Sequence, residues 1–441
     1  MSKSVAIVRQ RNLCTACGTC QAVCPAGAVR IVRNTAGFLV PEVDGAKCTS
    51  CGLCLRACPG VGLPRKLTEE YQDIFTGMVL GAWVGRATDE SLWKNGQSGG
   101  VASALLLYLL DKCLVDGAIV NGFDRTNRRP EVRIAKNKEE LLAAQGSWYA
   151  QSAVNTVAVG EGGSRMAAVV LGCQAEGVML TRLRAKGIET PEFLIGLVCA
   201  GNHSGLIIDD LVKQSGMKHS EVSEFRFRDK SAGGWPGNVT VTAQNSRAVL
   251  DKSKRIELKD CYGNYRCQCC FDQMNLFADV VLGDPWGIED GRERGGRSIM
   301  LARTEKGSEI IKGALQDGYV TAEPVSEGAV MKGQTVSSRL VPQFFALRRI
   351  AQEEELPFPT YGFNEENQAP VDEKKTRLYR ESMRYKFALQ KLDTTDGVNN
   401  AVTRMKAKIR RRAIPGKLAA IPRRVLGKVY RLLLKQKGAA R

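Results

Sequence analysis

Histidine is nearly absent from this sequence, which has only two, His203 and His219, among 441 residues. Haem ligation, histidine-rich metal sites and Ser-His-Asp catalysis all need histidine at defined positions, so we expect none of the three. Both histidines are expected to be structural or exposed. No catalytic acid or base can be named from the sequence.

Long apolar runs are missing as well. No segment of 18 or more apolar residues predicts a membrane-spanning helix, and the first ten residues, MSKSVAIVRQ, lack the apolar centre of a secretory signal. The chain has 15 cysteines, and metal-ligating thiolates need a reducing compartment. We therefore expect a cytoplasmic protein, or one attached peripherally to the inner face of the membrane.

Acidic residues are missing from the last 41 positions. Residues 401–441 contain 14 Lys or Arg, so the other 400 residues account for only +4 of the net charge of +18. Five apolar residues within this tail share one face of a helix: Val425, Leu426, Val429, Leu432 and Leu433. Residues 402–437 thus predict an interfacial helix on an anionic membrane surface. A solvated tail or a helix docked on protein are the alternatives, and the lack of interleaved aromatics argues against nucleic acid.

What the sequence does contain is cysteine in groups. Residues 1–62 hold two copies of C-x2-C-x2-C-x3-C-P, the spacing of a two-cluster bacterial ferredoxin domain. Three thiolates of each copy hold one [4Fe-4S] cluster, and the fourth crosses to the other cluster. The predicted ligands are Cys14, Cys17, Cys20 and Cys58 for one cluster, and Cys48, Cys51, Cys54 and Cys24 for the other. Zinc knuckles, the main alternative, rarely use this triple spacing.

The remaining chain predicts an α+β protein, with a mixed α/β catalytic body and a basic helical C-terminal tail. Its expected segments are 76–165, 166–335 and 336–441. Apolar runs at 78–85 and 114–122 predict strands on either side of a helix at 101–110, a βαβ-like order. Ser98-Gly99-Gly100 begins that helix, where free N–H groups and the helix dipole favour a phosphate. A plain helix start is the alternative, because the turn matches no established nucleotide fingerprint.

A second group of cysteines lies in 166–335. Cys173 and Cys199 each follow a predicted strand, where site residues of α/β sheets commonly lie, and a C-x2-C pair comes later. Four residues could thus hold a third [4Fe-4S] cluster: Cys173, Cys199, Cys267 and Cys270, with Cys261 and Cys269 as spare candidates. Scattered cysteines are more often plain buried residues, so spacing alone leaves both interpretations open. Cys113 is expected in the core.

Taken together, the motifs resemble the coenzyme F420 hydrogenase/dehydrogenase beta-subunit family over roughly residues 1–330. The resemblance rests on the N-terminal module and on Ser98-Gly99-Gly100, Gly172-Cys173-Gln174, Gly196 to Gly201, Cys267 to Asp272, Ala278-Asp279 with Gly283-Asp284, and Gly295 to Gly307. Residues 336–441 do not resemble the family core.

The resemblance implies an iron–sulfur flavoprotein oxidoreductase with a third cluster, FAD and coenzyme F420 as the organic hydride partner. Expected cofactor contacts are Ser98, Gly99 and Gly100 at the FAD pyrophosphate, Asp284 at the ribose, and Arg297 and Arg303 at phosphates or substrate carboxylates. Asp284 could instead end a strand without a role, and both arginines could be solvated surface residues. Trp148 and Tyr149 could line the pocket or belong to the core.

The sequence also fits two rival functions, besides a polyferredoxin without flavin. One is an electron-relay subunit of a larger dehydrogenase or hydrogenase complex. The other is a ferredoxin-dependent reductase of another organic substrate, such as a pigment, a sugar or a lipid. In each case the expected protein partner is ferredoxin or a larger redox complex.

Overall fold

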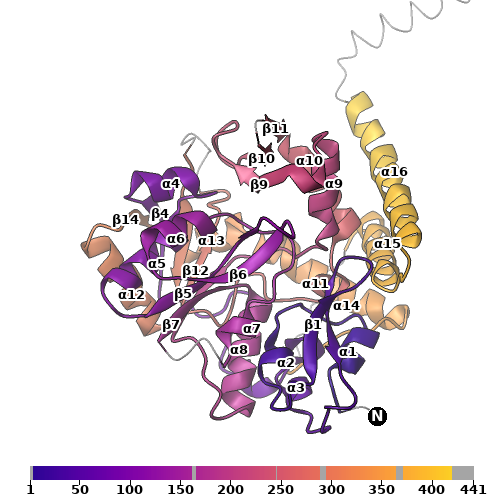
Figure 1. Cartoon of the computed structure of the whole chain (residues 1–441), viewed down its shortest axis with the longest axis horizontal. Coiled ribbons are helices and arrows are strands. Elements are labelled where there is room, and N and C mark those ends of the chain that lie inside the picture. The colour runs from indigo at the N-terminus through magenta and orange to yellow at the C-terminus, as the bar shows by residue number, and fades with distance from the viewer. Residues whose placement is uncertain (1–2, 161–164, 245, 289–294, 364–370, 420–441) are drawn as a thin grey trace, which may run out of the picture.

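An eight-stranded mixed sheet organises the body of the protein (Figure 1), for which a computed structural model describes residues 3–160, 165–244, 246–288, 295–363 and 371–419. Its strand order is β14 (Val320–Pro324), β4 (Gly81–Ala87), β13 (Ser298–Ala302), β12 (Val280–Gly283), β8 (Phe193–Leu197), β7 (Met166–Val170), β5 (Gly117–Asp124) and β6 (Arg129–Ala135). The four neighbours β12, β8, β7 and β5 pair in parallel. All other pairings in this sheet are antiparallel.

The strands predicted from apolar runs at 78–85 and 114–122 are confirmed as β4 and β5, and the helix between them as α5 (Val101–Asp111). The βαβ-like unit is wrong in one respect, because β13, β12, β8 and β7 lie between β4 and β5. A short helix, α4 (Glu90–Asn95), also precedes the glycine turn. Because the sheet takes strands from both 76–165 and 166–335, these two segments fold together.

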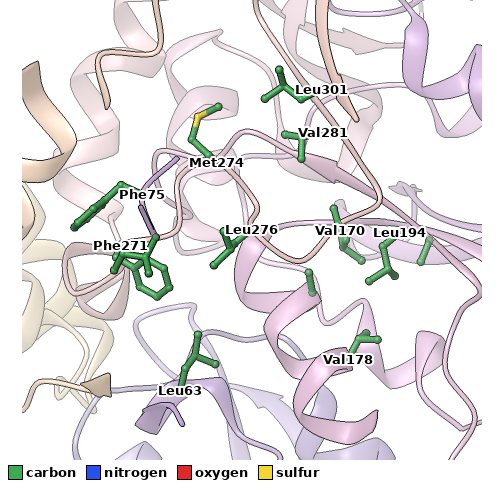
Figure 2. Close-up of a cluster of buried hydrophobic side chains, with 14 of the residues drawn as sticks. Leu63, Phe75, Val170, Val178, Leu194, Phe271, Met274, Leu276, Val281 and Leu301 are labelled. Atoms are coloured by element: carbon green, nitrogen blue, oxygen red, sulfur yellow. The ribbon is translucent and has the colours of Figure 1, made fainter. Parts of the chain in front are cut away.

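Buried side chains cover both faces of this sheet. On one face, α5, α6 (Lys138–Ala144) and α12 (Glu305–Gln316) pack against alternate residues of the strands. On the other, α8 (Gly172–Arg184) and the loop carrying Phe271 and Leu276 pack against Val170, Leu194 and Val281 (Figure 2). Each such aliphatic side chain contributes about 1.5–3 kcal/mol when fully buried. The strands are apolar on both sides for this reason.

The N-terminal module packs on the second face. It consists of a hairpin, β1 (Val29–Arg33) with β2 (Leu39–Val43), and of short helices that include α2 (Thr19–Ala22) and α3 (Leu53–Arg56). Buried polar contacts attach it to the body: Asn155 donates to the Thr19 hydroxyl at 2.8 Å, and Ser204 donates to the Ala36 carbonyl at 2.6 Å. The module is therefore fixed against the sheet domain.

Helices after residue 335 complete the domain. In α14 (Val341–Glu353), Phe344 is 1% exposed and joins the core beside Phe75 and Phe271. α15 (Glu373–Leu389) runs past the N-terminal module, where the Asn12 side chain donates to the Phe387 carbonyl at 2.9 Å. The segment that does not resemble the family core thus holds the module and the body together.

The last described helix, α16 (Thr395–Ala419), packs against the body. Val398, Val402 and Met405 are buried, and Arg404, Lys408 and Arg410 are exposed. The first residues of the predicted membrane segment 402–437 thus contact protein through Val402 and Met405, and the membrane contact itself stays a prediction. The face formed by Val425 to Leu433 lies outside the described residues. No helix in the described part of the chain is long and apolar enough to cross a membrane.

Candidate functional site

Two adjoining cavities open at the carboxyl ends of the parallel strands β7, β8 and β12, where ligands of open α/β sheets bind. The smaller has a volume of about 70 Å³ and the larger about 280 Å³. Both are lined by the same five residues: Leu171, Cys199, Ala200, Gly201 and Asn202. Only the two loops after β7 and β8 therefore separate them.

The smaller cavity is lined by all four cysteines of the predicted third site: Cys173, Cys199, Cys267 and Cys270. Cys173 is the second residue of α8, which follows β7, and Cys199 follows β8. The other two lie in and just after α11 (Tyr265–Gln268). Burial raises the pKa of the Cys173 thiol, and negative charge on Cys17, Glu176 and Cys267 would raise it further. Free thiolates are thus disfavoured here, whereas an iron core would stabilise them.

The spare candidates are absent from the lining of this cavity. Cys261 and Cys269 are both fully buried, but they pack in two other apolar clusters. Cys113 is exposed, with a φ of 53° at the turn after α5, so its predicted core position is wrong.

The eight N-terminal cysteines form two groups. Burial raises the pKa of the Cys20 thiol, and negative charge on Cys58, Cys17, Cys14 and Cys54 would raise it further, so Cys20 lies near the other three predicted ligands of its cluster and also near Cys54 of the second. The other four line a small cavity near the surface: Cys24, Cys48, Cys51 and Cys54. Each group combines three cysteines of one copy of the motif with the fourth of the other copy.

The three groups follow one another through the molecule. Cys54 of the surface group affects the pKa of Cys20, and Cys17 affects the pKa of Cys173. Thr15, from the first motif, lines the cavity of the third group. The group of Cys14, Cys17, Cys20 and Cys58 therefore lies between the other two.

In the described residues, no three His, Cys, Asp or Glu side chains lie close enough to hold one metal ion. Four sulfurs around a single tetrahedral ion would stand only about 3.8 Å apart, given metal–sulfur bonds of about 2.3 Å. Thiols spaced around a cavity instead suit an inorganic core of several atoms, and the donor set is entirely sulfur, as iron–sulfur clusters require.

The larger cavity contains the start of α5. Ser98, Gly100, Val101, Ala102 and Ser103 line it, and Gly100 has a φ of 72°. The first backbone bond of the helix runs from the Ala104 N–H to the Gly100 carbonyl, so the preceding N–H groups face the cavity end of the helix. These groups and the helix dipole suit a phosphate.

The glycine turn before α5 is fastened to the neighbouring strand. The Ser98 hydroxyl donates to the Arg297 carbonyl at 2.5 Å, and the Gly99 N–H donates to the Ser298 hydroxyl at 3.0 Å. A Cβ at Gly99 would lie 2.6 Å from the Gly85 carbonyl oxygen, so only glycine fits there. Gly99 shapes the turn, although it is not among the residues that line the cavity.

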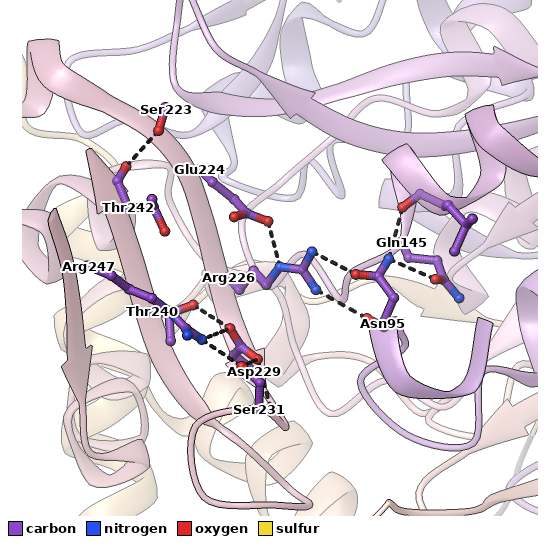
Figure 3. A network of polar contacts seen from close by, with 11 residues as sticks. Asn95, Gln145, Ser223, Glu224, Arg226, Asp229, Ser231, Thr240, Thr242 and Arg247 are labelled. Atoms are coloured by element: carbon purple, nitrogen blue, oxygen red, sulfur yellow. Dashed lines mark hydrogen bonds and ion pairs between the residues drawn. The ribbon is translucent and has the colours of Figure 1, made fainter. Parts of the chain in front are cut away.

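Three basic residues on β9 (Val222–Asp229) and just after it face this turn, and sequence reasoning missed them. Lys230 donates to the carbonyls of Trp93 and Ser98 at 2.6 and 2.7 Å. Arg226 donates to the Asn95 side chain at 2.8 Å (Figure 3). Arg228 lies between them. In the sequence these basic residues alternate with the buried Phe225 and Phe227. Such an alternation indicates a strand with one apolar face and one basic face, and it could have identified these residues.

Arg228 and Asp284 form a buried ion pair at the larger cavity. The guanidinium donates to both carboxylate oxygens, at 2.7 and 3.0 Å, and the two side chains are only 6% and 14% exposed. Trp235 also donates to Asp284, at 3.3 Å. The predicted position of Asp284 after a strand thus puts it at the cavity, but both of its oxygens are already bonded.

Arg297 and Arg303 do not line either cavity. Arg297 pairs with Glu323 at 2.9 Å and donates to the Val84 carbonyl. Arg303 is 4% exposed and donates to the carbonyls of Thr76, Met78 and Met274, so it fastens the segment before β4. Neither arginine is therefore placed to contact a phosphate in these cavities. The arginine that lines the larger cavity is Arg228.

One wall of the larger cavity is aromatic and polar. Trp148 and Tyr149 line it, and Trp148 stacks on Phe123 with ring centres 5.5 Å apart. Three buried polar atoms of lining residues have no hydrogen-bond partner: Gln97 Oε1, Asn121 Oδ1 and Trp148 Nε1. Buried polar atoms are normally paired, so this wall fits a ligand that offers both donors and acceptors.

The two histidines lie outside this lining. His203 is 8% exposed, and its Nδ1 lies 2.9 Å from the Tyr149 carbonyl. Burial lowers the pKa of His203 to about 4, so the ring is neutral and Nδ1 is the donor. His219 is partly exposed and pairs with Asp209.

Comparison with protein families gives three matches. Residues 82–158 and 163–328 match the N-terminal and C-terminal models of the coenzyme F420 hydrogenase/dehydrogenase beta subunit. Residues 13–61 match the 4Fe-4S dicluster domain. These ranges include all twelve cysteines of the three groups.

Two curated relatives are methanogen proteins. The coenzyme F420 hydrogenase subunit beta of Methanosarcina barkeri is 26% identical over 331 residues, covering 72% of this chain and 99% of the relative. That of Methanothermobacter thermautotrophicus is 27% identical over 299 residues, covering 64% and 99%. A chain of the F420-reducing [NiFe] hydrogenase complex from M. barkeri has a similar fold, with a TM-score of 0.50 at 23% identity, over 64% of this chain and 94% of that one.

Proposed function

Because the chain belongs to the coenzyme F420 hydrogenase/dehydrogenase beta-subunit family and carries a 4Fe-4S dicluster domain, we propose that it is an iron–sulfur flavoprotein oxidoreductase. It couples one-electron transfer to two-electron chemistry on an organic substrate, coenzyme F420 or a related compound. The observation that carries the proposal is the shared wall between the cavity of four cysteines and the larger cavity.

The proposed cluster ligands are the three groups of four cysteines described above. [4Fe-4S] clusters, when bound there, carry single electrons. Two hydrogen bonds hold the N-terminal module against the body beside the middle group: the Asn155 N–H donates to the Cys17 carbonyl at 2.9 Å, and the Asn264 side chain donates to the Cys14 carbonyl at 3.0 Å. Because Thr15 of the first motif lines the cavity of the third group, these two groups are neighbours, which suits electron transfer from one to the other.

FAD is the proposed occupant of the larger cavity, where it would supply the exchange between one-electron and two-electron transfer. The start of α5 would hold its pyrophosphate: Ser98 and Gly100 line the cavity there, and Gly99 shapes the turn between them. Gln97, Asn121 and Trp148 would pair with its polar ring edge, since their unpaired atoms include two acceptors and one donor. Asp284 acts by orienting Arg228, because its oxygens are already bonded to it.

A second candidate is an electron-relay subunit of a larger complex. The specific observation in its favour is that the relatives described above are named as subunits and that the similar solved chain belongs to a complex. Ferredoxin or another redox protein would then be the partner on the electron side. Turnover of F420 by the isolated chain would favour an enzyme, and its absence despite full cofactor content would favour the relay.

Anaerobic purification of the full chain tests the cofactors. We expect about twelve iron atoms per chain, from three clusters of four, and one flavin released by acid. Reducing the clusters with a low-potential donor should then reduce the flavin and F420. Iron–sulfur absorbance without any releasable flavin would refute the flavoprotein proposal, and flavin that stays oxidised beside reduced clusters would refute the coupling.

A further inference from the structure

Arg266 is a buried cation placed between two of the cysteine groups. It is 1% exposed and has the largest of the fully buried side chains among the described residues. Its Nη2 and Nε donate to the carbonyls of Pro59 and Gly60, at 2.9 and 3.3 Å, just after Cys58. Arg266 itself precedes Cys267 and lines the smaller cavity. One side chain thus contacts the backbone of the middle group and borders the third.

The charge of Arg266 acts on thiols of both groups. Burial raises the pKa of Cys14 to about 12, and Arg266 offsets part of that shift. It acts in the same direction on Cys58 in the middle group, and on Cys267 and Cys270 in the third. In the surface group, the cation that lowers the pKa of Cys51 is Arg56 instead.

A buried guanidinium is costly unless anions surround it. Arginine remains protonated inside proteins, so it cannot escape this cost by losing its proton. The hydrogen bonds of its guanidinium go to neutral carbonyls, and the guanidinium also lies 5.8 Å from the centre of the Tyr361 ring. In the described part of the chain no ion pair links Arg266 to a carboxylate. The charge of Arg266 does act on the buried carboxyl of Glu176, but burial raises the pKa of Glu176 to about 8, so that carboxyl is mostly neutral at pH 7. The compensating negative charge is therefore expected from what the cysteines hold.

We propose that Arg266 is a positioning residue whose fixed charge stabilises an added electron on the cluster sites of both the middle group and the third group. This inference rests on the proposed cluster ligands. A [4Fe-4S] core with four thiolates is anionic, and reduction adds one negative charge, so a buried cation favours the reduced state. Both sites then accept electrons more readily than they would beside a neutral residue, while the surface site is unaffected.

The test is a redox titration of the full chain, followed by the EPR signals of its clusters. In Arg266→Gln, two of the three reductions should become at least tenfold less favourable, a shift of 59 mV or more to lower potential. The third reduction should stay in place. Arg266→Lys keeps the charge and should recover at least half of each shift. Arg56→Gln is the matched control, and it should leave the two shifted potentials at their wild-type values.

Several outcomes would overturn the inference. Unchanged potentials in Arg266→Gln, or an equal shift of all three, would remove the local charge effect. Loss of iron in both Arg266 variants would make the residue a structural support only. Wild-type protein with about eight iron atoms would instead refute the ligand assignment of the third group, so the two failures are distinguishable.

Discussion

Replacing Asp284 by Asn tests how the buried ion pair shapes the larger cavity. The substitution keeps the size of the side chain and removes its charge. Arg228, whose side chain is 6% exposed, would lose the carboxylate that accepts two of its hydrogen bonds. The guanidinium would then be a buried charge without a counter-charge, although it would keep its bond to the Pro236 carbonyl at 2.7 Å.

Breaking a buried pair in this way costs about 3–5 kcal/mol. A chain of 441 residues unfolds with an entropy of about 0.9 kcal/mol/K, so each kcal/mol lowers Tm by about 1 °C. We therefore expect Asp284→Asn to lower Tm by about 3–6 °C. Glu323→Gln is the matched control, because it breaks the pair of Glu323 with Arg297, in which the Glu323 side chain is 64% exposed. An exposed pair contributes less than about 1 kcal/mol.

The assay is thermal unfolding of anaerobic protein together with flavin released per chain. A double variant, Arg228→Met with Asp284→Leu, removes both charges and should regain most of the lost stability. It should not regain flavin, because the polar cavity edge is gone. A Tm loss in Asp284→Asn no larger than that of Glu323→Gln would refute the reasoning.

Three other changes give separate tests. Cys270→Ala should lower iron from about twelve to about eight atoms per chain, and unchanged iron would reject Cys270 as a ligand. Deleting residues 414–441 should abolish binding to anionic vesicles and spare iron content, because α16 keeps its buried side chains up to Met405; vesicle binding that survives would place the contact elsewhere. Burial lowers the pKa of His203 from 6.5 to about 4, so below pH 6.5 the unfolded chain binds a proton that the folded protein does not. The stability that the neutral ring contributes is therefore complete above pH 6.5 and is lost as pH falls towards 4. That contribution is about 3 kcal/mol, so wild-type stability should fall more steeply across this window than that of His203→Asn, and parallel pH profiles would contradict the shift.

The N-terminal module and the strand ends were predictable because their signals are local. A loop that wraps one cluster needs three cysteines with two residues between each and the next, and the order of the chain alone gives that spacing. Cys173 and Cys199 could be placed at one sheet edge because each follows an apolar run, and the structure has β7 and β8 at those runs. Which of the late cysteines share a cavity depended on the fold of the loop around Phe271.

The polar contacts at the larger cavity could not be predicted because their partners are far apart in sequence. Arg228 pairs with a residue 56 positions later, and Lys230 bonds to a carbonyl 132 positions earlier. The sequence shows the alternation of basic and aromatic residues on this strand, but not which element its basic face meets. Arg303 was predicted to contact phosphates because the sequence does not show that its guanidinium donates to three backbone carbonyls.

The exposure of the cysteine groups differs from one end of the series to the other. Cys51 is exposed at the surface, whereas Cys17, Cys20 and Cys58 of the middle group are buried. The third group borders the larger cavity, because Cys199 lines both cavities. Electron transfer between proteins needs a short distance between centres, so a protein partner is expected to exchange electrons at the surface group. The organic substrate is then expected at the opposite end of the series, and α15 stabilises the whole path by bonding the N-terminal module to the body on the side of α11.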